Sequence, residues 1–164
     1  MKFLNITRFN SLTIILLKIS LFALSAPSFT QDYKVKKVGK AFSHPWGISV
    51  FDDDEVLITE RGGDLFKVNI ENGSSIKISN LPDVFNVRQG GLLDVLIDKE
   101  SVSERNVYIC YSSKVSGGSS TTLMAGTLKE DKLISKKILF KSNNVSESGV
   151  HFGCRLAILN DEIF

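Results

Sequence analysis

The sequence contains two histidines, His44 and His151, and both are candidates for acid–base chemistry. An imidazole titrates near neutral pH, so it can accept a proton from a hydroxyl group in a transition state. His151 opens the segment His-Phe-Gly-Cys-Arg-Leu and is the stronger candidate for a general base. The alternative for both residues is a hydrogen-bonded structural histidine near the start of a strand.

Three further polar side chains stand in or just before apolar segments. Gln89 can donate and accept hydrogen bonds, so it could orient a ligand group. If residues 151–158 form a strand, alternation places His151 and Arg155 on the same side. A guanidinium facing a channel suits an anionic ligand, and a salt bridge between neighbouring sheets is the alternative. Asp94 could pair with a basic group or simply fill a polar position.

The elements that would position these residues are predicted to be strands joined by tight turns, which is typical of antiparallel meanders. Almost no helical period interrupts them, so the chain is predicted to be all-β. A Gly- and Ser-rich linker is expected at 116–120, and a third set is expected to begin with a strand at 151–158. The other predicted strands are 46–51, 55–60, 65–70 and 75–79 in a first set, and 92–97, 106–111, 121–128 and 133–140 in a second.

Four-strand units in series indicate a β-propeller. The first strand of each unit contains a glycine, as expected where neighbouring blades approach closely around a central channel. The residues just before these strands would lie at the channel mouth. The glycines are Gly47, Gly91 and Gly153, and the preceding residues are His44, Gln89 and His151.

A propeller typically has about four to eight blades. The predicted elements supply two blades and the start of a third, so we expect an N-terminal fragment of a longer protein. A small complete β-sandwich is the alternative.

The N-terminal residues 1–28 have the pattern of a signal peptide. A positive region with Lys2 and Arg8 precedes an apolar run, and small residues allow cleavage before Phe29. A membrane anchor is the alternative, but Lys18 shortens the run below the roughly 20 apolar residues that a span needs. We therefore expect a periplasmic or secreted protein without stable membrane insertion, whose propeller domain covers 29–164.

The rest of the chain is close to neutral. Residues 1–28 hold three of the 20 basic side chains and no acidic one, which leaves 17 basic against 18 acidic side chains. This balance gives no electrostatic footprint for nucleic acid.

Two cysteines, Cys110 and Cys154, each fall in a predicted strand. Their even number permits a disulfide in an oxidising compartment. The favoured interpretation is nevertheless two buried, unpaired residues that pack as small apolar side chains. Their spacing offers no zinc site.

Four segments, in order between about Tyr33 and Phe164, resemble the soluble glucose/sorbosone dehydrogenase family that depends on pyrroloquinoline quinone (PQQ). This family includes the periplasmic aldose sugar dehydrogenases. The segments are His44-Pro-Trp-Gly, Leu57-Ile-Thr-Glu-Arg-Gly-Gly, Gln89-Gly-Gly-Leu-Leu-Asp-Val and His151-Phe-Gly-Cys-Arg-Leu.

The resemblance implies a six-bladed β-propeller, of which this chain matches the first third to half. It also implies oxidation of a sugar's anomeric hydroxyl by hydride transfer to PQQ, with a separate electron acceptor. His151 then corresponds to the general base, Gln89 lies beside it in the pocket, and Arg155 contacts the cofactor or supports the site. Calcium ligands and the basic residues that hold the quinone are expected in later blades.

Two positions depart from the family's pattern. Val150 stands where glycine is common, and Cys154 stands where glycine or serine is common. Two other functions remain open. One is a non-catalytic secreted propeller that binds carbohydrate or a protein partner, and the other is a calcium-dependent hydrolase of propeller type.

Overall fold

The computed structural model describes residues 33–99 and 105–164. The chain divides into two units, residues 1–36 and 37–164, and all strands of the described part lie in the second unit. The secondary structure of the described ranges is entirely β. Within them, no helix is long and apolar enough to cross a membrane. The expected signal peptide, residues 1–28, lies outside the described residues.

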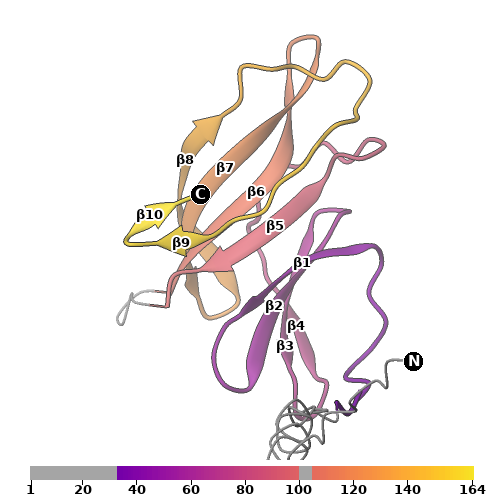
Figure 1. Cartoon of the computed structure of the whole chain (residues 1–164), viewed down its shortest axis with the longest axis vertical. Helices are drawn as coiled ribbons and strands as arrows, with labels where there is room; N and C mark the ends of the chain where they lie inside the picture. Colours follow the sequence, from indigo (N-terminus) through magenta and orange to yellow (C-terminus); the bar gives the residue numbers. More distant parts are fainter. Residues whose placement is uncertain (1–32, 100–104) are drawn as a thin grey trace, which may run out of the picture. The chain divides into compact units, whose positions relative to one another are not determined.

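The first sheet is an antiparallel meander in which each strand pairs with the next one along the chain (Figure 1). Short polar side chains close its turns. The carboxylate of Asp52 accepts the backbone N–H groups of Asp54 and Glu55 at 3.1 and 2.9 Å, and Asn69 caps a later turn in the same way. The strands are β1 (Pro45–Val50), β2 (Glu55–Glu60), β3 (Asp64–Asn69) and β4 (Ser75–Lys77).

The second sheet is a longer antiparallel meander. Its two central strands pair continuously from Arg105 opposite Leu128 to Val115 opposite Gly118. The linker predicted at 116–120 is therefore wrong: Ser116 and Gly117 form a tight turn, and the next strand begins directly after them. The strands are β5 (Leu92–Ile97), β6 (Arg105–Val115), β7 (Gly118–Lys129) and β8 (Lys132–Lys141).

The strand predicted at 151–158 is also wrong over most of its length. Residues 151–157 belong to no strand, and only the short hairpin of β9 (Ile158–Leu159) and β10 (Glu162–Ile163) follows. His151 has a φ of 67°, a left-handed conformation that does not fit a strand. Side chains in this segment do alternate between more and less exposed positions, as the sequence pattern predicts, but the backbone of 151–157 pairs with no neighbouring strand.

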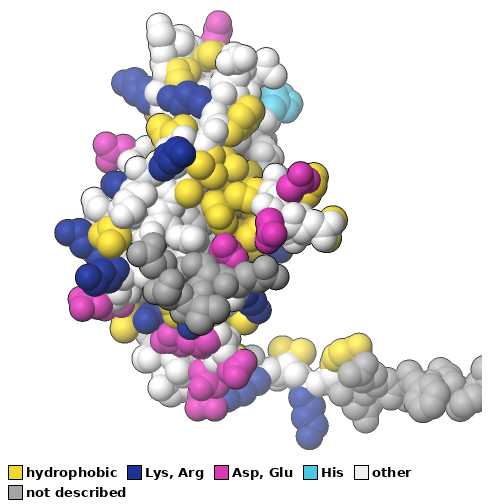
Figure 2. Space-filling view, turned by 90° about the vertical axis from the view of Figure 1, so that its left-hand side faces the viewer, with side chains coloured by type: hydrophobic (Ala, Val, Ile, Leu, Met, Phe, Trp, Pro, Cys, Tyr) yellow, Lys and Arg dark blue, Asp and Glu magenta, His cyan; other side chains and the backbone are white. Residues whose placement is uncertain are grey.

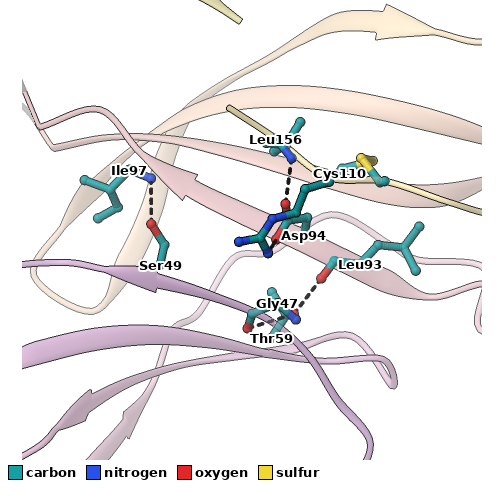
Figure 3. Close-up of polar contacts among 10 residues, drawn as sticks. Gly47, Ser49, Thr59, Leu93, Asp94, Ile97, Cys110 and Leu156 are labelled. Carbon is teal, nitrogen blue, oxygen red and sulfur yellow. Dashed lines mark hydrogen bonds and ion pairs between the residues drawn. A yellow bond between two sulfur atoms is a disulfide. The ribbon is translucent and has the colours of Figure 1, made fainter. Parts of the chain in front are cut away.

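The two sheets meet at their first strands. Gly47 of β1 lies against β5 so closely that a Cβ atom there would come within 2.6 Å of Asp94 Oδ1 and 3.0 Å of the Leu93 carbonyl oxygen. The N–H of Gly47 donates to Thr59 Oγ1 at 2.8 Å, and the Thr59 hydroxyl donates to the Leu93 carbonyl at 2.6 Å (Figure 3). This close approach of first strands is the one predicted for neighbouring blades of a propeller.

A buried apolar cluster joins the two sheets behind this contact. Its members come from both meanders and are less than 9% exposed. Other large apolar side chains face solvent, and Figure 2 shows hydrophobic side chains gathered near the middle of the face that it presents. The buried cluster includes Leu57, Leu65, Ile78, Leu92, Val95, Ile109, Met124 and Leu133.

Candidate functional site

The segment 151–156 alternates between exposed and buried side chains, although it is not a strand. Phe152 and Leu156 are 7% and 8% exposed and pack with Leu93 and Cys110 of the second sheet. His151, Gly153 and Arg155 form the exposed row. His151 and Arg155, which were predicted to lie on the same side of a strand, are thus both exposed, although the strand itself is absent.

The structure brings His151 and Gln89 together. The backbone N–H of His151 donates to Gln89 Oε1 at 2.7 Å, and the backbone N–H of Gln89 donates to the Gly149 carbonyl at 3.0 Å. These two hydrogen bonds hold the loop of Gln89 against the loop of Gly149 and His151, and Gln89 and His151 are 62 residues apart in sequence. Because Oε1 accepts this bond, Gln89 chiefly offers a ligand the donors of its Nε2 group.

Asp94 connects the same segment to β5 at its other end. The carboxylate is 2% exposed; its Oδ2 accepts the Leu156 N–H at 2.7 Å, and its Oδ1 lies 3.4 Å from Arg155 Nη1 (Figure 3). Of the two interpretations left open for Asp94, the structure shows the pairing with a basic group, and for Arg155 it shows the salt bridge that was the alternative to ligand binding. The Arg155 side chain remains 75% exposed, so most of its donors still face solvent.

The other candidate histidine lies in a different setting. His44 is exposed at the start of β1, where its Nδ1 lies 3.2 Å from the Ser43 hydroxyl and its carbonyl accepts the Arg61 N–H. These contacts are all within the first sheet. They match the structural interpretation of His44 and do not join it to the pair of Gln89 and His151.

The expectation that the two cysteines stay unpaired is wrong, because Cys110 and Cys154 form a disulfide. Cys110 is 1% exposed on β6, and Cys154, which is half-buried, stands between Phe152 and Leu156. Their Cα atoms are 6.4 Å apart, within the range that a disulfide spans. The sequence left this pairing open because only the tertiary structure brings together two positions separated by 44 residues.

An open groove of about 630 Å³ adjoins His151. Its main wall is the loop 142–149, which was not among the residues that the sequence singled out as a candidate site. A run of serine and asparagine directly before a candidate base was the signal that could have identified it. The groove is lined by Thr121, Ser142, Asn144, Val145, Ser146, Glu147, Ser148, Val150, His151 and Phe152.

Two tyrosines of β6 lie close to the disulfide-bonded residue of that strand. Burial raises the pKa of Tyr111, and burial followed by the negative charge of Asp98 raises the pKa of Tyr108. Both phenols therefore stay protonated at neutral pH and act as donors, not as bases. Among the described residues, no three His, Cys, Asp or Glu side chains are grouped so that they could hold a metal ion.

Residues 42–164 match the family described as Glucose / Sorbosone dehydrogenase. The match spans most of the chain, and the chain belongs to this family of sugar dehydrogenases. The all-β propeller fold expected from the sequence is confirmed by solved structures of the same type.

The chain is similar to one sequence relative and two solved structures, as follows. The chain is 34% identical over 117 residues to the aldose sugar dehydrogenase YliI of Escherichia coli (strain K12). The matched region covers 69% of this chain and 32% of YliI. The crystal structure of the soluble aldose sugar dehydrogenase from Escherichia coli, in its apo form, is 32% identical with a TM-score of 0.65, covering 71% and 35% of the two chains.

The PQQ-bound aldose sugar dehydrogenase from Streptomyces coelicolor is similar in fold, with a TM-score of 0.63 at 20% identity over 74% of this chain and 36% of that one. The present chain thus spans about a third of the length of these relatives.

Proposed function

We propose that this chain supplies the general-base side of a PQQ-dependent aldose dehydrogenase site, with His151 as the base. The observation that carries the proposal is the bond from the His151 backbone N–H to Gln89 Oε1, which fixes the backbone of an exposed histidine next to an amide side chain; His151 also lines an open groove. The family supports a sugar as substrate, since the relatives with assigned names are sugar dehydrogenases.

The exposed donors of Gln89 and Arg155 are of the chemical types that would suit PQQ, a quinone that carries carboxylates. Arg155 keeps most of its guanidinium exposed next to Asp94, and guanidinium groups bind carboxylates well. Gln89 offers amide donors that suit a carbonyl or carboxylate oxygen. We therefore propose Gln89, His151 and Arg155 as the residues of this chain that contact the cofactor.

When bound, PQQ supplies the redox chemistry, because it accepts a hydride from the anomeric carbon of the sugar. His151 accepts the proton of the anomeric hydroxyl, so the sugar loses a hydride and a proton and becomes a lactone. The exposed position of His151 lets it pass this proton to water afterwards. Repeated turnover would require an acceptor for the two electrons removed from each sugar, and we propose such an acceptor as the second partner.

Calcium is implied by the same resemblance. Since the described residues contain no group of side chains suited to a metal, we propose that its oxygen ligands belong to other parts of the protein.

The test is a dye-reduction assay with aldoses on the full-length protein, supplied with PQQ and calcium. The variant His151→Ala should lower kcat/KM by about a hundredfold to ten-thousandfold, the usual contribution of a general base. The variant Lys137→Ala, on the exposed part of β8, serves as the control and should retain activity.

Unchanged activity in His151→Ala would refute the assignment of the base. Sugar binding by the wild type without any dye reduction would favour the alternative of a non-catalytic, carbohydrate-binding propeller.

We also propose that the protein is periplasmic or secreted. The disulfide between Cys110 and Cys154 supports an oxidising compartment, because such bonds are rare in a reducing cytosol. The signal-peptide pattern of residues 1–28 supports the same location.

A further inference from the structure

The segment that contains His151 and Arg155 is held without a backbone ladder. Residues 151–157 are in no strand, and polar contacts fix the two ends of the segment. At one end the His151 N–H binds Gln89, and at the other the Leu156 N–H binds Asp94. Backbone bonds flank the segment, since Gly149 accepts the Gln89 N–H and Ala157 exchanges two hydrogen bonds with Phe164. Between these points, the backbone positions of His151 and Leu156 are held by the two side-chain contacts.

A covalent bond lies between these two ends. Cys154 is half-buried and packs against the buried cluster that contains Phe152 and Leu156. It is joined to Cys110, which is 1% exposed at a position of β6 that pairs with Leu123 of β7. The disulfide thus connects the segment to the interior of a four-stranded sheet. His151 precedes this anchor and Arg155 follows it directly.

We propose that the disulfide between Cys110 and Cys154 is a positioning cross-link, which holds His151 beside Gln89 and Arg155 beside Asp94. The inference rests on the proposed function only for what the held residues do. Neither cysteine touches substrate or cofactor in this scheme.

Among the polar contacts that Gln89 and Asp94 make with the segment, only the bond from the Leu156 N–H to Asp94 is buried. Gln89 is exposed, and the Arg155 side chain is 75% exposed, so water competes for both. Without the cross-link, the segment would open in local fluctuations that leave the sheets folded. The buried side chains Phe152 and Leu156 would then be its remaining apolar anchors.

Amide hydrogen exchange of the full chain tests this proposal, with the double variant Cys110→Ala/Cys154→Ala as the cross-link-free protein. The matched control is Leu133→Ala, which removes a fully buried side chain of the other apolar cluster and lowers global stability without touching the segment. The His151 and Leu156 amides should exchange at least about tenfold faster in the cysteine variant than in the control, because local opening adds to global unfolding.

Equal exchange in the two variants would overturn the proposal, since the disulfide would then be a general stabiliser only. If the double variant fails to fold, reduced wild-type protein replaces it. Dithiothreitol breaks the sulfur–sulfur bond, yields two thiols and itself becomes a cyclic disulfide. Reoxidation must then restore the original exchange rates, and failure to restore them would also count against the proposal.

The imidazole signals of His151 give a second measurement by NMR. We expect one sharp set in the cross-linked protein, and broadened or multiple signals after the bond is removed, while Leu133→Ala keeps the single set. A single sharp set in all three proteins would contradict the proposal. Neither measurement uses sugar or quinone. A failed dye-reduction assay would therefore not contradict the role of the disulfide, and a failed exchange or NMR test would not contradict the proposed dehydrogenase function.

Discussion

Gly47 and Thr59 determine how closely the two sheets approach each other. Gly47 leaves room for the buried carboxylate of Asp94, and Thr59 bridges Gly47 to the Leu93 carbonyl. Asp94 in turn accepts the Leu156 N–H, so the same carboxylate lies against Gly47 and holds the segment that contains His151. The packing of these residues thus links the contact between the sheets to the candidate site.

We predict that Gly47→Ala lowers the free energy of unfolding by about 1–3 kcal/mol, the usual cost of overpacking. The added methyl group would stand 2.6 Å from Asp94 Oδ1 and 3.0 Å from backbone atoms, which have little freedom to move. Urea denaturation measures the change. The control is Gly62→Ala, where a Cβ atom meets nothing within 4 Å, and its stability should change by less than about 0.5 kcal/mol. Equal losses in both variants would contradict this account of Gly47.

Among the elements, the meanders were the most predictable part. The strand predicted at 55–60 has the bounds of β2, and that at 92–97 the bounds of β5, because alternating apolar residues and turn residues are local signals. The segment after 150 was not predictable in this way. Its alternation is real, but the left-handed backbone at His151 and the absence of a paired strand at 151–157 depend on contacts with distant residues.

The same distinction applies to the candidate site. Gln89, His151 and Arg155 were identified from their types and their place before or within predicted strands, and the structure brings Gln89 next to His151. The disulfide itself was not predicted, because bond formation depends on the distance of 6.4 Å between the two Cα atoms, which local sequence does not determine.

The turn between β1 and β2 gives a prediction at the scale of one hairpin. Asp52→Ala removes an acceptor for two backbone N–H groups, so we expect a loss of about 0.5–2 kcal/mol in the free energy of unfolding, as for other capping residues. Its neighbour Asp53 is exposed in the same turn, and Asp53→Ala is the matched control with an expected change below about 0.5 kcal/mol. Chemical denaturation compares the two, and a larger loss in Asp53→Ala would show that the turn is held in another way.

At the scale of the whole molecule, the sequence joins an export signal pattern to a β-propeller portion that spans about a third of its relatives' length. The disulfide and the signal-peptide pattern support export independently, because the first depends on the tertiary contact between Cys110 and Cys154 and the second on the composition of residues 1–28. Both support the proposal that the protein lies outside the cytosol.

We predict that the protein isolated from its native compartment begins at Phe29, because the small residues before it suit a signal peptidase. N-terminal sequencing measures this directly. The protein made without export, in a reducing cytosol, serves as the control and should keep its N-terminal residues and lack the disulfide. An N-terminus that still includes residues 1–28 in the exported protein would contradict the prediction.

The bond between Gln89 and His151 also has a consequence for the order of folding. The hairpins of both sheets close short loops, whereas this bond and the one from Leu156 to Asp94 each close a loop of 62 residues. Because loop-closure entropy rises with the length of the loop, local contacts form more readily than distant ones. We therefore expect the sheets to form first and the site to assemble last, with disulfide formation locking an arrangement that the completed sheets have already selected.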